Sequence, residues 1–376
     1  MPRPSVRIFL CGDVMTGRGV DQALAHPCDP ELRESYMRSA LDYLELAEQA
    51  SGPIPRPVGP GYVWGAALEE LRTAAPDVRL VNLETAITRS ADFAPKGINY
   101  RMAPENAGCL SAAGIDACSL ANNHVLDFGP SGLLETLETL QDLGVAATGA
   151  GRNLAEAGAP AVIPLPGKSA RVIFLGAALE DSGVPPGWRA GPDHPGVNLV
   201  EPSREAARSL AARIAELRRP GDVAVVSIHW GSNWGYQVPE PHRRFAHALL
   251  DTGQVCVIHG HSSHHPRPIE IYRDRLILYG CGDFLTDYEG IGGFEAFRGD
   301  LTAMYLADLD HEGALLGLDL VPFRIRRLRL ERAAPDEVRW VGETLARESH
   351  PFGVDLGAVD PAHLRATPRG RSRATP

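Results

Sequence analysis

The stretch Ser119-Leu-Ala-Asn-Asn-His-Val-Leu-Asp-Phe-Gly129 decides the fold of this chain. It completes an apolar run, residues 115–120, whose length and composition are typical of a buried strand. Pro130 then begins a segment with leucines at helical spacing, which predicts a helix that ends near Gly144. A strand that passes through a polar turn into a helix is the repeating unit of α/β proteins, and such turns carry functional side chains. We therefore predict an α/β fold with a functional site at this turn.

The turn itself offers an amide and an imidazole. Asn123 provides a carbonyl oxygen and His124 a ring nitrogen, and this pair suits a divalent ion of the Mn, Fe, Zn or Mg type. The alternative is that Asn122 and Asn123 cap the following helix and that His124 packs in the core. The ends of the other predicted strands favour the first interpretation.

Those strands end in the same kinds of residue. Apolar runs at residues 6–11, 78–83, 223–228 and 255–258 predict four of them. They lead into Asp13, Glu84, His229 and the cluster His259-Gly-His261-Ser-Ser-His264-His265. Taken singly, each residue could instead cap a turn or pack in the core. The carboxyl ends of strands in an open α/β sheet hold the functional side chains. Together these residues have the types and number needed for two divalent ions that share a bridging carboxylate.

Three residues near these strand ends are predicted to bind substrate: Arg18, Asn122 and Trp230. Arg18 could hold a substrate anion or cap its own loop. Trp230 could form a wall of a substrate groove or pack in the core, and the same two interpretations apply to the other tryptophans.

The composition excludes several classes of function. The chain has 376 residues, is 44% hydrophobic and carries a formal net charge of −10, which argues against a nucleic-acid partner. No apolar run approaches the roughly 18 residues of a membrane span, and the N-terminal stretch lacks the features of a secretory signal. The six cysteines form no CxxC pair, so we predict buried thiols in a reducing compartment. We therefore expect a cytoplasmic protein with neither a nucleic-acid partner nor a membrane span.

The chain is predicted to have one main domain and a C-terminal extension. The main domain covers residues 1–325 and the extension residues 326–376. The end of the extension, beyond Pro361, is rich in Arg, Pro and Thr, and we expect it to be disordered.

The motifs together resemble the CapA family of capsule and poly-γ-glutamate synthesis proteins, which are related to the calcineurin-like metallophosphoesterases. They occur in family order over about residues 6 to 310. The matching stretches are Gly12-Asp13-Val-Met-Thr-Gly-Arg18, Val81-Asn-Leu-Glu84-Thr, Leu120-Ala-Asn-Asn-His124-Val-Leu-Asp127-Phe-Gly129, Ile228-His-Trp-Gly231, Gly260-His-Ser-Ser-His264 with Pro268-Ile-Glu270, and Leu278-Tyr-Gly-Cys-Gly-Asp-Phe284. The resemblance implies a four-layer α/β/β/α metallophosphoesterase-like sandwich.

The resemblance also implies roles for particular residues. One metal ion would be held by Asp13, Glu84 and His264, and the other by Glu84, Asn123, His229 and His261. His124 would be the catalytic histidine, oriented by Asp127. The metal could be Mn, Zn, Ca, Mg or Fe, as one ion or two. Two departures weaken the first position: Met15 stands where the phosphoesterases have a histidine, and the final motif has one extra residue before His264.

Three functions are compatible with this site. The first, and our best prediction, is acid/base chemistry on a peptide or peptide-like substrate, as in the CapA-like epimerases of lasso-peptide pathways, which invert a C-terminal Cα. His124 would be one proton-transfer group, with His265, His259 or Asp283 as the second. The second is hydrolysis of a phosphoester or amide at the metal site. The third is a non-catalytic role in capsule or poly-γ-glutamate assembly.

Overall fold

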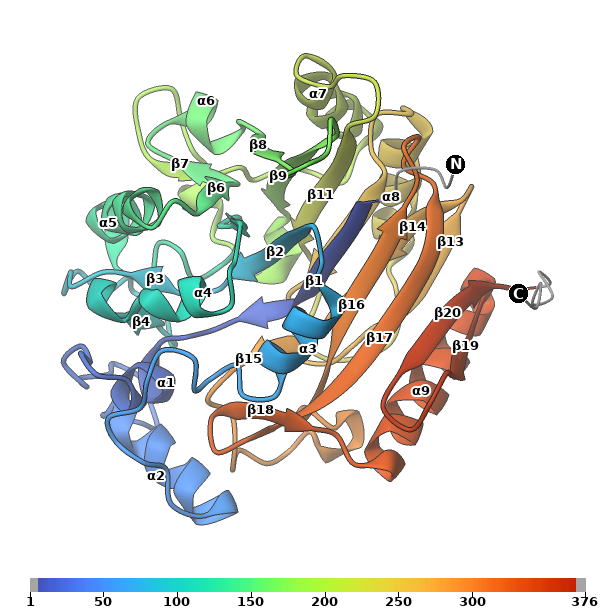
Figure 1. Cartoon of the computed structure of the whole chain (residues 1–376). Helices are drawn as coiled ribbons and strands as arrows, with labels where there is room; N and C mark the ends of the chain where they lie inside the picture. The colour runs from blue at the N-terminus through green and yellow to red at the C-terminus, as the bar shows by residue number, and fades with distance from the viewer. Residues whose placement is uncertain (1–5, 370–376) are drawn as a thin grey trace.

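The computed structural model describes residues 6–369, in which two β-sheets face each other (Figure 1). The larger sheet has the order β19 (Val354–Ala358), β20 (Leu364–Pro368), β17 (Leu315–Arg326), β16 (Leu301–Leu309), β1 (Val6–Val14), β2 (Val78–Leu83), β5 (Ala117–Ser119), β6 (Ala146–Thr148). Two further strands join it, β15 (Asp283–Leu285) beside β1 and β18 (Arg329–Arg332) beside β17. The smaller sheet has the order β13 (Ile269–Tyr272), β14 (Arg275–Leu278), β12 (Val257–His261), β11 (Val223–His229), β9 (Arg171–Ala178), β8 (Ala161–Pro164).

Two short strand pairs and nine α-helices surround the two sheets in the described residues. The pairs are β3 (Ala86–Ile87) with β4 (Arg101–Met102), and β7 (Ala150–Gly151) with β10 (Gly196–Val197). The α-helices are α1 (Arg18–Ala23), α2 (Ala40–Ser51), α3 (Ala67–Ala74), α4 (Gly108–Ala112), α5 (Gly129–Asp142), α6 (Leu154–Ala157), α7 (Arg204–Ala215), α8 (Glu240–Asp251) and α9 (Pro335–Ser349). No helix in the described part of the chain has the length and apolar composition needed to cross a membrane.

The two sheets pack face to face through an apolar core. Alternate residues of the central strands point into it, among them Ile8 of β1, Leu80 of β2, Phe174 of β9 and Val225 of β11, all fully buried. Such a core forms because each sheet must bury its apolar face against another element. It fixes the distance between the strand ends of one sheet and those of the other.

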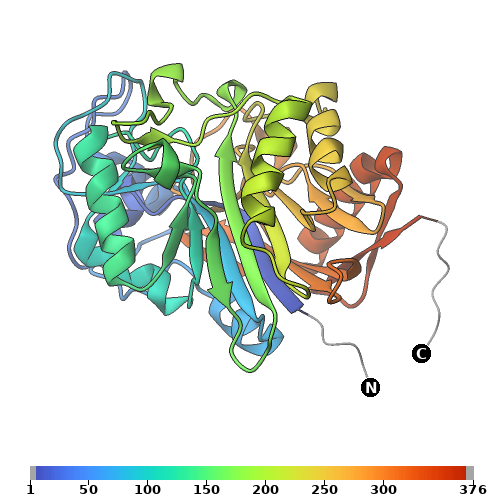
Figure 2. The ribbon, with the colours of Figure 1, turned by 90° about the horizontal axis from the view of Figure 1, so that it is seen from above.

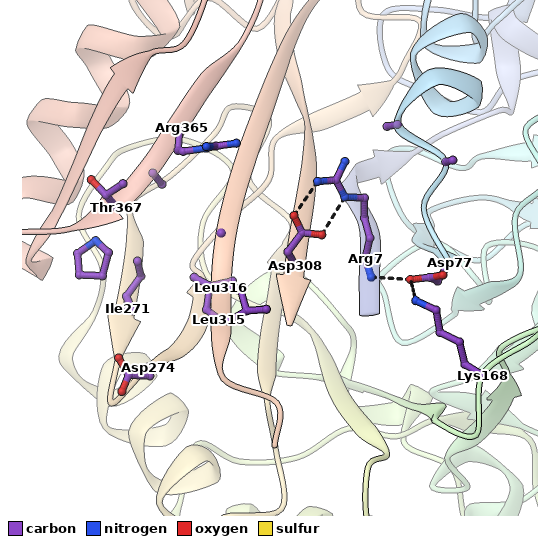
Figure 3. Close-up of a pocket in the computed structure, with 15 residues that line it drawn as sticks. Arg7, Asp77, Lys168, Ile271, Asp274, Asp308, Leu315, Leu316, Arg365 and Thr367 are labelled. Atoms are coloured by element: carbon purple, nitrogen blue, oxygen red, sulfur yellow. Dashed lines mark hydrogen bonds and ion pairs between the residues drawn. The ribbon is translucent and has the colours of Figure 1, made fainter. Parts of the chain in front are cut away.

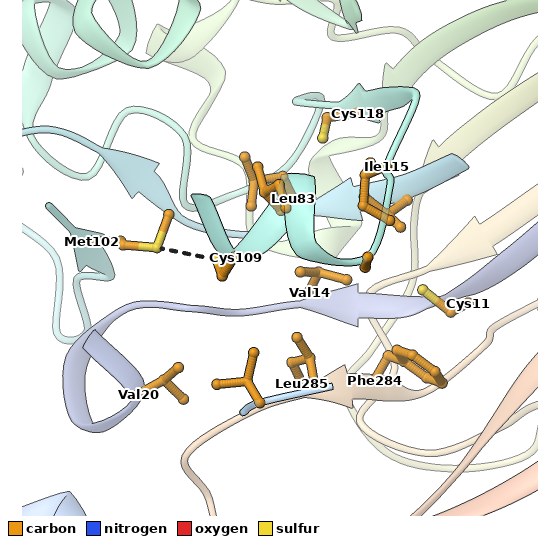
Figure 4. Packing of buried hydrophobic residues seen from close by; sticks show 14 of the residues in the cluster. Cys11, Val14, Val20, Leu83, Met102, Cys109, Ile115, Cys118, Phe284 and Leu285 are labelled. Carbon is orange, nitrogen blue, oxygen red and sulfur yellow. Dashed lines mark hydrogen bonds between the residues drawn. The ribbon is translucent and has the colours of Figure 1, made fainter. Parts of the chain in front are cut away.

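Helices cover the outer face of each sheet. On the larger sheet, α2, α3, α4 and α5 pack against strands that include β1 and β2, and Figure 4 shows buried residues of this cluster. On the smaller sheet, α7 and α8 pack against β9, β11 and β12. The view from above shows helices on both sides of the strands (Figure 2). The predicted α/β/β/α sandwich is therefore confirmed.

The C-terminal extension continues the larger sheet. β20 pairs antiparallel with β17 and with β19, and α9 packs its apolar side in the same core cluster. The disorder predicted beyond Pro361 is therefore wrong for the residues of β20, because paired backbone groups and the buried Leu364 hold them in place. The rest of the predicted disordered end, residues 370–376, lies outside the described residues.

Gly12 allows a close approach between β1 and the chain before β15. A Cβ at this position would lie 1.8 Å from the carbonyl oxygen of Gly282. We expect Gly12→Ala to lower the free energy of unfolding by about 3 kcal/mol or more, because rigid backbone must move. Gly59→Ala, where no atom lies within 4 Å of the added Cβ, is the control for denaturant unfolding. Equal stability of the two variants would contradict this interpretation.

The opposite end of the strands forms a cavity of about 590 Å³. Figure 3 shows that charged residues in its wall bond to one another. Arg7 donates to Asp308 at 2.8 Å, and Lys168 donates to Asp77 at 2.7 Å. These charged groups therefore satisfy each other.

Candidate metal centre

The carboxyl ends of β1, β2, β11 and β12 and the first residue of β15 bring their polar residues together between the sheets. In the larger sheet, Asp13 of β1 is in register with Asp283 of the parallel strand β15. In the smaller sheet, His229 of β11 is in register with His261 of β12. Glu84 directly follows β2. All of these side chains are buried, so their charges and lone pairs must be satisfied within the protein.

Three carboxylates form the first part of the centre. Oxygen atoms of Asp13, Glu84 and Asp283 lie within 4.8 Å of one another. Burial and the neighbouring Asp283 raise the pKa of Asp13 to about 7, and burial and Asp13 raise the pKa of Glu84 well above its usual range. Like charges confined in a buried space disfavour ionisation. A cation among these oxygens would relieve that repulsion.

Two imidazoles form the second part. A carboxylate oxygen of Asp13 and a ring nitrogen each from His229 and His261 also lie within 4.8 Å of one another. The Nδ1 atoms of the two histidines are 2.8 Å apart. His229 Nε2 is 3.1 Å from Asn123 Oδ1 and 3.6 Å from Glu84 Oε1.

These distances show that a divalent ion fits the residues present. A neutral imidazole has a single proton and can donate to only one of the two sides that His229 faces. A second proton is disfavoured, since burial and the neighbouring His124 lower the pKa of His229 well below its usual range. With its single proton on Nδ1, His229 Nε2 faces the oxygens of Asn123 and Glu84 without a proton; with the proton on Nε2, Nδ1 presents its lone pair toward His261. Nitrogen and oxygen lone pairs that converge in this way are the environment of a bound transition metal.

His124 lies at the edge of this cluster and is held by Asp127. His124 Nδ1 is 2.6 Å from Asp127 Oδ2, and its Nε2 is 4.0 Å from Glu84 Oε1. The ring stacks on Tyr100, with 3.7 Å between the ring centroids. Burial lowers the pKa of His124 to about 4, although Asp127 opposes this shift. The ring is therefore neutral at neutral pH, with its free nitrogen directed to the carboxylates.

Lys96 completes this dyad, and sequence reasoning missed it. Its ammonium group lies 2.8 Å from Asp127 Oδ1 and 3.3 Å from His124 Nδ1, and it donates to the backbone carbonyl of Asn123. The chain contains only one other lysine, Lys168. The only signal in the sequence was therefore a lysine kept in a chain that otherwise uses arginine.

The other two predicted histidines have different surroundings. His264 Nδ1 bonds to Asp283 at 3.0 Å and its Nε2 lies 2.9 Å from Asn233 Nδ2, so His264 reaches the carboxylates through Asp283. Both nitrogens of His265 have backbone partners: the amide of Gly235 donates to Nε2, and Nδ1 lies 3.0 Å from the carbonyl of Pro266. The structure therefore does not bring His265 to the cluster.

The three residues predicted to bind substrate are buried and have protein partners. Arg18 pairs with Asp287 and with Glu34. Asn122 accepts from the backbone amides of His124 and Val125, each at 3.0 Å, and so shapes the turn. Trp230 packs in the core of the smaller sheet and donates to the carbonyl of Tyr279.

Asp283 is the main addition to the predicted ligands. Sequence analysis considered it only as a second proton-transfer group. Its pairing with Asp13 across β1 and β15 could not be predicted, because the two residues are far apart in the chain. It completes the oxygen cluster with Asp13 and Glu84.

Comparison with known proteins finds similarity to bacterial capsule synthesis proteins. The family model described as bacterial capsule synthesis protein PGA_cap matches residues 7–288. A probable polyglutamine synthesis accessory protein of Mycobacterium tuberculosis is 49% identical over 93% of this chain and 92% of its own length. The capsule biosynthesis protein CapA of Bacillus anthracis is 26% identical, over 84% of this chain and 67% of its own length. The PGA biosynthesis protein CapA of Bacillus subtilis is 27% identical, over 57% of this chain and 54% of its own length. On these matches, and with the fold that the resemblance implied, the chain belongs to the bacterial capsule synthesis protein family PGA_cap.

Proposed function

We propose that this chain is a metal-dependent enzyme that breaks or transfers an amide bond in a peptide-like polymer of glutamate or glutamine. The observation that carries the proposal is the direction of the His124–Asp127 dyad, whose free nitrogen faces the buried carboxylates. The names of the relatives suggest the substrate class, since they refer to polyglutamine and PGA synthesis. A non-catalytic role in capsule or polyglutamate assembly is the alternative to this proposal.

The chain's own residues provide the parts of an acyl-transfer reaction. His124 takes the proton of the attacking water or amine, whose O–H or N–H bond breaks as its oxygen or nitrogen bonds to the amide carbon. His124 then returns the proton to the leaving nitrogen as the C–N bond breaks. Asp127 holds the proton on Nδ1, so that Nε2 is free, and Lys96 fixes Asp127. A divalent ion held by Asp13, Glu84, Asp283, Asn123, His229 and His261 would supply Lewis acidity to the carbonyl oxygen and to water.

Peptide epimerisation is the second candidate. Removal of a Cα proton also requires an unprotonated imidazole, and the lowered pKa of His124 keeps the ring neutral at neutral pH. The second proton-transfer group would be Asp283, since His265 is held by backbone groups.

The test begins with metal content, measured by elemental analysis of the full chain after reconstitution with manganese or zinc. The loaded protein is then given α-linked and γ-linked glutamate oligomers, a glutamine oligomer and an aryl phosphate. The expected result is oligomers that are shortened by hydrolysis or joined to an amine by acyl transfer. Solvent deuterium at Cα of an intact oligomer would support the epimerase instead, and phosphate release would support a phosphoesterase. A protein that binds no metal and changes none of these compounds would overturn the enzymatic proposal and favour an assembly role.

A further inference from the structure

A chain of buried polar contacts leads from the backbone of β1 to His261. His259 Nε2 lies 2.7 Å from the carbonyl oxygen of Cys11. His259 Nδ1 lies 3.1 Å from Ser227 Oγ, and the same Oγ lies 2.8 Å from His261 Nε2. The side chains of Ser227, His259 and His261 are fully buried, so no water competes for these contacts.

The direction of every hydrogen bond in this series of contacts follows from the first one, between His259 and the carbonyl of Cys11. A backbone carbonyl can only accept, so His259 Nε2 must carry a proton. The buried His259 ring has no charged partner among these contacts and is therefore neutral. Its Nδ1 then has no proton and accepts from the Ser227 hydroxyl. With its only hydrogen used, Ser227 Oγ can only accept from His261. His261 therefore carries its proton on Nε2, and its Nδ1 is a free lone pair.

We propose that Ser227 and His259 are positioning residues that fix the tautomer of His261 so that its unprotonated Nδ1 faces Asp13 and His229. Nδ1 lies 3.6 Å from Asp13 Oδ1 and 2.8 Å from His229 Nδ1. The opposite tautomer would place an N–H group between these atoms, where a metal ion would have to bind. The consequence for metal affinity rests on the proposed function, but the tautomer itself does not.

The tautomer can be measured in the metal-free full chain by nitrogen NMR with isotope-labelled histidine. The His261 signals are assigned by their loss in His261→Asn. We expect one protonated and one bare nitrogen on His261, with the proton on Nε2. A proton on Nδ1 would overturn the proposal whether or not the protein binds metal.

Ser227→Ala breaks the hydrogen-bond relay that runs from the Cys11 carbonyl through His259 and Ser227 to His261. It does not remove any candidate metal ligand. The Nε2–H group of His261 loses its acceptor, so we expect the proton to move toward Nδ1 and the metal dissociation constant to rise about 10- to 100-fold, as for other outer partners of metal ligands. Ser263→Ala is the matched control: Ser263 is also buried, donates to the carbonyl of His265 at 2.9 Å and lies outside the relay. The control should change neither the tautomer nor the affinity.

The outcomes separate this proposal from the proposed function. If His261 has the expected tautomer and loses it in Ser227→Ala but the wild type binds no metal, the relay is supported and the metal-dependent function is not. If metal binds with the same affinity in wild type and Ser227→Ala, and the tautomer does not change, the relay is overturned and the function is not.

Discussion

Replacing Glu84 by glutamine is expected to weaken metal binding by more than about 100-fold, beyond the 10- to 100-fold range typical of changes to outer partners of ligands. The same substitution should leave the metal-free protein as stable as the wild type, or more stable, at neutral pH. The opposite effects on metal binding and stability would arise from one cause, the negative charge confined among Asp13, Glu84 and Asp283.

The pH dependence follows from the direction of the pKa shift. Burial and Asp13 raise the pKa of Glu84 above its usual value of 4.5 in the folded, metal-free protein. Above pH 4.5 the unfolded chain therefore loses this proton while the folded protein keeps it, and the wild type loses stability as the pH rises. Glutamine cannot ionise, so the stability of Glu84→Gln relative to wild type should grow from acidic to neutral pH.

Denaturant unfolding at acidic and at neutral pH measures the change in stability, and metal titration measures the change in metal affinity. Glu70→Gln is the matched control, because Glu70 is also buried but has basic partners: Arg332 at 3.1 Å and His363 at 3.2 Å. It should lose stability and keep metal affinity. A Glu84→Gln variant that is less stable than wild type at neutral pH would show that Glu84 is compensated within the protein, and unchanged metal affinity would remove it from the centre.

The strand ends were predictable because two local signals coincide in each. An apolar run predicts the strand, and a polar residue at its end predicts which side chain reaches the edge of the sheet. This reasoning located Asp13, Glu84, Asn123, His229 and His261, which the structure brings to one place. Local spacing was sufficient because parallel pairing aligns the ends of the strands without any further information.

Other features depend on contacts that local patterns do not encode. After His261 the chain turns at Ser262, whose φ of 102° carries the next residues out of the sheet. His264 and His265 are close to His261 in sequence, and for that reason they were predicted to share its site. In the structure their partners are Asp283 and backbone groups.

The partner of the buried residue Arg18 could not be predicted from the sequence. The sequence leaves open whether it binds a substrate anion or a residue of the protein. Its partner Asp287 lies 269 positions away and is fully buried. The pairing is a consequence of the closed sandwich, and composition or spacing could not have predicted it.

Replacing His124 by phenylalanine is expected to lower turnover of the glutamyl oligomers by about 10²- to 10⁴-fold, the usual contribution of a general acid or base. Phenylalanine keeps a ring to stack on Tyr100 but removes both nitrogens. Metal content should not change, because His124 belongs to neither group of converging ligand atoms. Turnover with saturating metal and metal content by elemental analysis are the two measurements.

His265→Phe is the matched variant, because His265 was also predicted to be catalytic. Its ring lies among Trp234, Tyr236 and Phe297, so phenylalanine suits the site. The variant should keep turnover and lose about 1–3 kcal/mol of stability at neutral pH, because the amide of Gly235 and the carbonyl of Pro266 lose their partner.

The acid dependence of that loss gives a further check. Burial lowers the pKa of His265 from 6.5 to about 4, so the folded protein excludes a proton that the unfolded chain accepts. The stability that His265 contributes is present above pH 6.5 and declines as the pH falls toward 4. The deficit of His265→Phe should therefore shrink over this range. If instead His265→Phe abolishes turnover and His124→Phe does not, the proton-transfer role belongs on the Trp234 side of the centre and the proposed direction of attack is wrong.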